Sequence, residues 1–271
     1  MKRQPQETGA VRRTLASIAA LVILGALATG VTLGYLKLRG LWLEQCVLRD
    51  LDRQVTIESG RRVKPDVIRE AFGLKEGANL ALVDFAARRE EALRKYPSIK
   101  TIDISRRLPD GVAITVTERE PFVRVNLRNV KGESGRVADL EGVVFQCRRG
   151  TAMLPSIREN EAPGTQPGEK LSGHALAALS VLRVAAEPDF SELSILEIDT
   201  SRPDFLLLTL GNYSRAKLCW DGMDRPSPAS DAELRTRLTN LQRTIATNLS
   251  PALIWNATIH GIVTADPNGV N

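Results

Sequence analysis

Histidine and cysteine, which commonly carry acid–base, nucleophilic or metal chemistry, are few and scattered in this sequence. Only two of its 271 residues are histidines, and we expect His174 at a helix start and His260 on the polar face of a strand. Glu118 and Glu120 have the residue type of a general acid–base pair, but with Arg119 between them on an exposed strand they would have no pocket. The chain lacks G-x-S-x-G, H-E-x-x-H and C-x-x-C motifs and any phosphate-cradling glycine loop. We therefore predict a protein that is not an enzyme and holds no metal or cofactor.

The three cysteines are too few and too widely spaced for a disulfide scaffold or a zinc ribbon. Cys46, Cys147 and Cys219 are expected to be small buried hydrophobic residues. Cys147 and Cys219 both fall in strand-like stretches, so a disulfide between them in an oxidising compartment stays open.

Composition is that of a globular protein, with 43% hydrophobic and 25% charged residues, and the length allows about two domains. The net charge of +5 is concentrated at the start, where residues 1–36 contain four basic residues and one acidic residue. The remainder is nearly balanced. With 4% aromatic residues and no basic–aromatic interleaving, we expect no nucleic acid as ligand. Because catalytic motifs are lacking, we also expect no small-molecule substrate.

The stretch from Thr14 to Leu36 contains 23 residues and no charge. A helix of that length, at about 1.5 Å per residue, crosses a hydrocarbon core of roughly 30 Å. We predict a single-pass type II protein of the plasma membrane, with a cytoplasmic tail at 1–13 and the bulk of the chain outside. Ala26-Leu27-Ala28 has the form of a signal-peptide cleavage site, which is the alternative.

After a connector at 37–51, residues 52–119 have the pattern of a small α+β domain. Pro65 suits a first helical turn, Gly73 suits a helix end, Asp84 can cap a second helix, and Leu-Pro-Asp-Gly at 108–111 suits a tight turn. The expected elements, in order, are a strand at 53–59, helices at 65–72 and 85–96, and strands at 98–107 and 111–119.

The stretch E-R-E-P at 118–121 ends the last of these strands without a glycine or asparagine turn. Glu118, Arg119 and Glu120 are expected to lie in water or against one another. Pro121 has no N–H to donate, so strand pairing should be interrupted there and resume with a new partner. We predict an extended interdomain joint, which would fix two small domains better than a glycine linker. An ordinary surface strand end is the alternative.

Residues 120–263 read as a second domain of short strands and turns with two or more helices. One helix is expected at 174–188, and an amphipathic helix that Asp231 can cap is expected at 231–248. The last ordered strand is expected to run to Val263, followed by a flexible tail at 264–271.

Three pieces of sequence carry a family resemblance: GLKEGANLALVDFAARREEALRKYPSIKTIDISRRLPDGVAITVTEREPFV at 73–123, ADLEGVVF at 138–145 and LPSI at 154–157. In their order and spacing, from about residue 12 to 263, the chain resembles the FtsQ/DivIB family of bacterial cell-division proteins. The resemblance implies an α+β chain with one N-terminal transmembrane helix, a βααββ POTRA domain and a mostly antiparallel β domain. It also implies a non-catalytic scaffold at the division septum that binds FtsB-like and FtsL-like proteins.

The final strand is where we place partner binding, because an unpaired sheet edge can accept a partner's strand. An interior strand is the alternative. The resemblance puts FtsB contact on this strand and on the helix at 231–248. The residues we assign to partner binding are Ile254, Trp255, Asn256, Thr258, His260 and Ile262.

Two other functions stay open at this point. A POTRA domain also occurs in envelope proteins of secretion or assembly, although no long set of alternating strands for a membrane barrel is visible. A membrane-anchored cell-wall enzyme would need a nucleophile or metal site, and the sequence shows neither.

Overall fold

The computed structural model describes residues 8–107, 109–128, 135–160, 164–248 and 254–265, with side chains from Leu24 onward. The chain divides into two compact units. The first contains residues 1–89 and 103–116, and the second contains residues 90–102 and 117–271. The second unit thus includes residues 90–102, which precede the E-R-E-P stretch in the sequence.

The chain begins with one long helix, α1 (Thr8–Gln45), which contains the uncharged stretch at 14–36. Side chains before Leu24, and all of residues 1–7 of the predicted tail, lie outside the described residues. Among the side chains that are described, no helix is long and apolar enough to cross a membrane.

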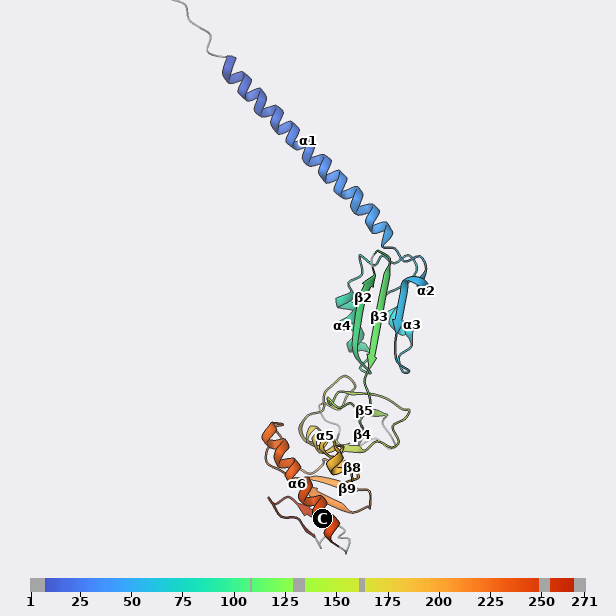
Figure 1. Cartoon of the computed structure of the whole chain (residues 1–271), viewed down its shortest axis with the longest axis vertical. Coiled ribbons are helices and arrows are strands. Elements are labelled where there is room, and N and C mark those ends of the chain that lie inside the picture. Colours follow the sequence, from blue (N-terminus) through green and yellow to red (C-terminus); the bar gives the residue numbers. More distant parts are fainter. Residues whose placement is uncertain (1–7, 108, 129–134, 161–163, 249–253, 266–271) are drawn as a thin grey trace, which may run out of the picture. The chain divides into compact units, whose positions relative to one another are not determined.

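The predicted βααββ order of the first domain is confirmed (Figure 1). The three strands form a sheet in the order β1-β3-β2, with β1 and β3 parallel. Asp84 Oδ1 accepts hydrogen bonds from the Ala86 and Ala87 N–H groups, as expected of a cap, and Gly73 has φ +65° just past a helix end. Leu108 of the predicted turn lies outside the described residues. The elements are α2 (Leu51–Gln54), β1 (Val55–Glu58), α3 (Pro65–Ala71), α4 (Phe85–Lys95), β2 (Ile99–Arg107) and β3 (Gly111–Glu118).

Within the first unit, the end of α1 is fixed to the loop before α4. The Asn79 side chain donates to the Leu43 carbonyl over 2.9 Å, which satisfies one carbonyl at the helix end. Leu48 N–H donates to the Ala78 carbonyl, and Leu80 N–H donates to the Cys46 carbonyl. Alternate residues of β3 are buried, as the sequence pattern predicted.

The second unit contains one mixed sheet of nine described strands, in the order β12-β11-β10-β9-β8-β7-β4-β5-β6. Five neighbouring pairs are antiparallel and three are parallel, namely β4–β7, β7–β8 and β10–β11. The predicted majority of antiparallel pairing is therefore correct for this sheet. Its strands are β4 (Val123–Leu127), β5 (Arg136–Ala138), β6 (Val144–Gln146), β7 (Ser156–Glu159), β8 (Ile195–Asp199), β9 (Leu206–Leu210), β10 (Arg215–Leu218), β11 (Ile254–Ala257) and β12 (Thr264–Ala265).

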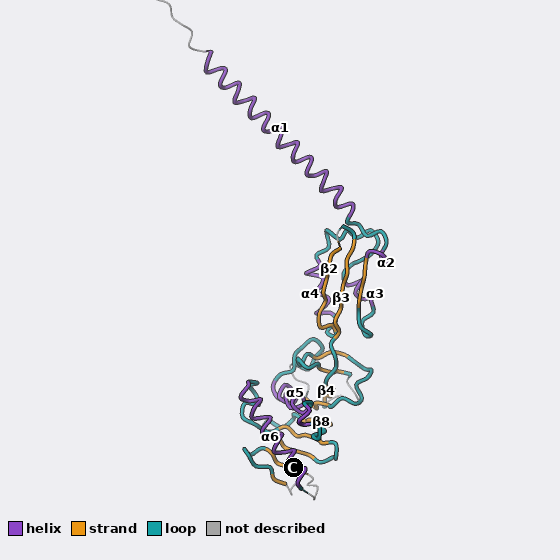
Figure 2. Tube along the Cα trace, viewed as in Figure 1, coloured by secondary structure: helices purple, strands orange, loops and turns teal. Residues whose placement is uncertain are grey.

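Two helices of the second unit, α5 (Gly173–Ala185) and α6 (Pro228–Thr247), pack on each other and on the sheet (Figure 2). A short 3-10 helix, η1 (Pro188–Phe190), contacts both of them. Strands β4 and β9 alternate between buried and half-buried residues, so one face of the sheet forms the core with the helices. α5 is the more deeply buried helix, because seven of its apolar residues lie in this core.

Two boundaries in the second unit differ from the sequence prediction. Asp231 does not cap α6: the helix begins three residues earlier, at Pro228, and the Ser227 side chain accepts from the Ser230 N–H. The last long strand ends at Ala257 rather than at Val263. Asn256 Oδ1 accepts from the Thr258 N–H over 3.1 Å and from the Thr258 hydroxyl over 2.8 Å, and this local turn ends the strand.

The cysteines are all free, and Cys46 and Cys147 are buried, as expected for small apolar residues. Cys219 is half-buried, and burial raises its thiol pKa.

Candidate functional site

The partner-binding surface predicted at the C-terminal edge of the second unit is built from β11, β12 and the turn between them. β11 pairs with β10 along its whole length and with β12 through Trp255 and Asn256, so it is an interior strand. Among the described strands, the edge at this end of the sheet is instead β12, a strand of two exposed residues. Residues 266–271 of the predicted flexible tail lie outside the described part of the chain.

The six predicted partner-binding residues fall into two groups. Ile254 and Trp255 are buried, and Trp255 belongs to the core of the second unit, so neither side chain is available to a partner in this fold. Asn256 and Thr258 are half-buried, whereas His260 and Ile262 are exposed in the turn after β11. A partner-binding role for these four residues stays a prediction.

Ile259 falls within the strand that we expected to run to Val263, but the observed strand ends at Ala257. Ile259 is 56% exposed beside Ile262 at 53%. Two large apolar side chains exposed in one turn next to a sheet edge are typical of a binding surface.

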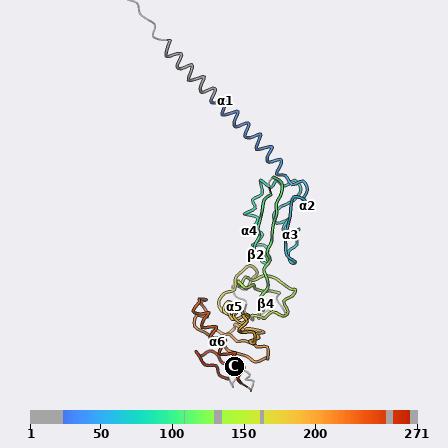
Figure 3. Tube along the Cα trace, in the orientation of Figure 1, coloured from blue at the N-terminus to red at the C-terminus, as the bar shows by residue number. Residues whose placement is uncertain are grey.

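Figure 3 shows α6 beside the red segment of β11 and β12. A cluster of Glu233, Arg237 and His260 connects the turn after β11 to this helix. Glu233 Oε1 lies 2.8 Å from both Arg237 Nε and His260 Nδ1. The Arg237 hydrogen bond, followed by the His260 contact, lowers the pKa of the Glu233 carboxyl. The carboxylate therefore holds the exposed turn against the helix.

The E-R-E-P stretch shows the strand break expected at Pro121. β3 ends at Glu118, and β4 begins at Val123 in the other sheet. The expectation that its charged residues lie in water is wrong for Arg119. Its Nη1 lies 2.5 Å from Asp139 Oδ2, with side chains only 17% and 4% exposed. Glu120 is exposed, while Glu118 and Pro121 are half-buried.

Arg119 is held from three directions within the second unit. Its backbone N–H donates to the Ser98 carbonyl over 2.8 Å, and its Nε donates to the Pro97 carbonyl over 3.2 Å. Asp139 also accepts from the Val143 N–H over 2.8 Å. A buried, hydrogen-bonded ion pair therefore fixes the chain just before β4. Its role as an interdomain joint remains a prediction.

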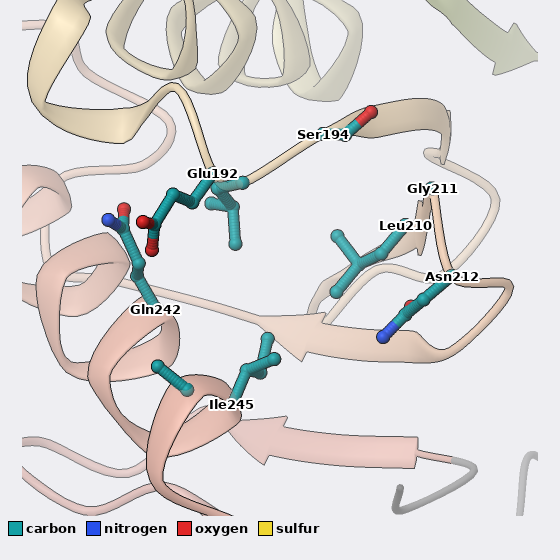
Figure 4. A pocket seen from close by; sticks show the side chains of 9 residues that line it. Glu192, Ser194, Leu210, Gly211, Asn212, Gln242 and Ile245 are labelled. Carbon is teal, nitrogen blue, oxygen red and sulfur yellow. The ribbon is translucent and has the colours of Figure 1, made fainter.

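A pocket of about 210 Å³ lies between α6 and the ends of β8 and β9 (Figure 4). It is lined by Glu192, Leu193, Ser194, Leu210, Gly211, Asn212, Gln242, Ile245 and Ala246. Sequence reasoning missed this pocket, since its residues come from three stretches separated by up to 54 positions. Within the described residues, no three histidine, cysteine, aspartate or glutamate side chains gather as metal ligands.

Comparison with known proteins identifies the first domain. Residues 52–119 match the FtsQ-type POTRA domain. The chain is 36% identical over 156 residues to a cell division protein FtsQ of Streptomyces collinus, a match that covers 56% of this chain and 53% of the relative. It is also 26% identical over 220 residues to an FtsQ of Streptomyces bingchenggensis, covering 79% of this chain and 74% of the relative. Residues 52–119 are thus an FtsQ-type POTRA domain, and the chain is similar beyond it to cell division proteins named FtsQ.

A third relative carries the other name of the family. The chain is 26% identical over 106 residues to a cell division protein DivIB of Clostridium acetobutylicum, a match that covers 39% of this chain and 41% of the relative. The match to the Streptomyces collinus FtsQ spans about half of that protein, 53% of its length. All three of these relatives are named as cell division proteins.

Proposed function

We propose that this protein is a bitopic membrane scaffold of the bacterial division machinery, without catalytic activity. The observation that carries the proposal is the FtsQ-type POTRA match at 52–119 together with cell-division relatives that extend beyond it. In this proposal the units outside the membrane recruit other division proteins to the septum, and the partners are FtsB-like and FtsL-like chains.

The anchor in this proposal is α1, with residues 1–13 in the cytoplasm and residues 14–36 in the bilayer. Its described apolar side chains have no protein neighbours to cover them, since Leu27, Val31 and Leu33 are 62%, 72% and 62% exposed. Two threonine hydroxyls among the described side chains of this stretch are satisfied within the helix. Thr29 donates to the Gly25 carbonyl and Thr32 to the Ala28 carbonyl, as a segment without access to water requires.

The partner-binding surface in this proposal is the open edge of β12 with the turn at 258–263 and the adjoining α6. The edge offers backbone groups to an added strand, and exposed Ile259 and Ile262 offer apolar contact area beside it. Their position next to Glu233 and His260 gives the surface a polar rim.

The proposal is tested by expressing the tagged full chain in dividing bacteria. We expect it to gather at midcell and to co-purify with FtsB-like and FtsL-like coiled coils. Diffuse envelope staining, with neither coiled coil recovered, would refute the scaffold function. Alkaline carbonate extraction tests the anchor separately, because a membrane-spanning chain stays in the pellet.

A pair of variants tests the binding surface. Ile259→Asp with Ile262→Asp should lower recovery of the coiled coils about tenfold or more, the loss expected of an interface hot spot. Met153→Asp is the matched control, because Met153 is an apolar residue 97% exposed elsewhere in the second unit. Equal recovery with the double variant and the control would place partner binding elsewhere.

A further inference from the structure

Two hydrogen-bond acceptors without donors lie at one end of the pocket beside α6. Gln242 Nε2 donates to the Asp189 carbonyl over 3.3 Å, which orients the amide and turns Oε1 the other way. In the described part of the chain, this buried Oε1 has no hydrogen-bond partner. The Glu192 carboxylate, which is exposed, likewise has no ion-pair or hydrogen-bond partner among the described residues. A buried acceptor left without a donor is costly, so this end of the pocket favours a ligand that donates.

Apart from Ser194 and Asn212, the side chains that line the rest of the pocket are apolar. Leu193 and Leu210 are buried at 5% and 4% exposure, and Ile245 packs against the same core. Figure 4 shows the Glu192 and Gln242 side chains turned toward one another, with Leu210 and Ile245 facing the space beside them. A molecule that fits must therefore have an apolar stem and a cationic, hydrogen-donating end.

The turn from β9 to β10 contributes Gly211 and Asn212 to the wall of this pocket. Gly211 lies so close to Ser194 that an added Cβ would stand 2.9 Å from its Oγ and 3.0 Å from its Cβ. Tyr213, which follows the pocket residue Asn212, has φ +63° and is 83% exposed.

We propose that this pocket binds a lysine or arginine side chain of a partner protein. The aliphatic stem would lie along Leu210 and Ile245, and the cationic end would donate to Glu192 and to Gln242 Oε1. An anion would be repelled by Glu192, and a purely apolar side chain would leave Gln242 Oε1 without a donor. The identification of the ligand as a partner's side chain rests on the proposed scaffold function.

The experiment uses the full chain in lipid nanodiscs, with ¹³C-labelled isoleucine methyl groups. The probe is n-butylguanidinium, and n-butylurea is its neutral control of the same shape. We expect n-butylguanidinium to shift the Ile245 methyl signal saturably, with an affinity about fivefold or more above that of n-butylurea. A shift that does not saturate, or equal affinity for the two compounds, would overturn the proposal.

Variants assign the two acceptors. Glu192→Gln should weaken n-butylguanidinium binding about two- to fivefold, as expected for a partly exposed ion pair. Gln242→Leu, which keeps the side-chain size and removes the acceptor, should weaken it about tenfold. Asp204→Asn, at an exposed carboxylate outside the pocket lining, should leave the affinity unchanged. Unchanged isoleucine signals elsewhere show that each variant is folded.

Each result separates the two proposals. If Glu192→Gln and Gln242→Leu both bind the probe as tightly as the unaltered chain, the pocket assignment is wrong whatever the cellular role. If the probe binds as expected but the chain fails to gather at midcell, the scaffold function is wrong and the chemistry of the pocket stands.

Discussion

Asp139→Asn should be among the most destabilising single substitutions in the second unit. The Asp139 carboxylate is 4% exposed and lies 2.5 Å from Arg119 Nη1. Asparagine keeps the size of the side chain, and its carbonyl can still accept from the Val143 N–H. The substitution therefore removes the negative charge and leaves the guanidinium of Arg119 largely buried without its carboxylate.

The expected loss in the free energy of unfolding is about 2–3 kcal/mol. Breaking a buried ion pair by removing one partner costs roughly 3–5 kcal/mol, because a charge stays buried without compensation. Arg119 retains the Pro97 carbonyl at 3.2 Å and is 17% exposed, so the cost falls below that range. A double variant, Asp139→Asn with Arg119→Met, should cost less than the sum of the two single variants, because no charge then remains buried.

Urea unfolding of the full chain, followed by tryptophan fluorescence, measures this loss. Trp220 and Trp255 are each 4% exposed in the core of the second unit, so their emission reports its unfolding. With a urea dependence of about 1–3 kcal/mol per molar, the midpoint should fall by roughly 1 M.

Lys100→Gln is the control for the Asp139 variant, because Lys100 and Glu141 pair at 2.8 Å but are 44% and 50% exposed. Their exposed pair should contribute less than about 1 kcal/mol. If Asp139→Asn and Lys100→Gln shift the midpoint equally, the argument that burial makes the Arg119 pair important is wrong.

Three further predictions concern the second unit. Trp255→Ala should lower the free energy of unfolding by about 3–5 kcal/mol in urea titrations, since Trp255 is a core residue; a loss below 1 kcal/mol would contradict that placement. The pKa of Glu233 is lowered from 4.5 in the folded protein. The ionised carboxylate therefore stabilises the folded state fully above pH 4.5, and this contribution is lost as the pH falls through the lowered pKa. Unfolding midpoints measured across this acid range should fall less steeply in Glu233→Gln, and equal slopes would refute the linkage. Gly222→Ala should lower the free energy of unfolding more than Gly150→Ala in the same urea assay. Both glycines have positive φ, but only at Gly222 would an added Cβ meet Ser230, at 2.9 Å. Equal losses would show that the crowding at Gly222 is relieved.

Local signals in the sequence predicted much of the fold. The alternation of β3 and the cap at Asp84 depend on neighbouring residues, so a single sequence shows them. Ser227-Pro228 is also a local helix-start signal, and it prevailed over Asp231 because proline is favoured in the first turn. The length of the last strand was overestimated, since apolar alternation continued through Ile259 while the Asn256 side chain had already turned the backbone.

Long-range contacts could not be predicted in the same way. Arg119 and Asp139 are 20 positions apart, and nothing in either local pattern indicates that they pair. The pocket beside α6 requires that the end of η1, the β9–β10 turn and α6 meet, which depends on the order of nine strands in the sheet. The resemblance to the FtsQ/DivIB family supplied the sequence of domains but not these contacts.

The short edge at β12 limits what strand addition alone can contribute to partner binding. Two residues offer about two backbone hydrogen bonds to an added strand, which at roughly 0.5–1.5 kcal/mol each contribute about 1–3 kcal/mol. A micromolar complex requires a net binding free energy of about 8 kcal/mol, which remains after the cost of association has been met. In the proposed complex, side chains must therefore supply most of the binding free energy. The exposed apolar side chains of the turn at 258–263 and the pocket beside α6 are the surfaces that we propose supply it. A partner that offered a strand without matching side chains would bind too weakly to be retained.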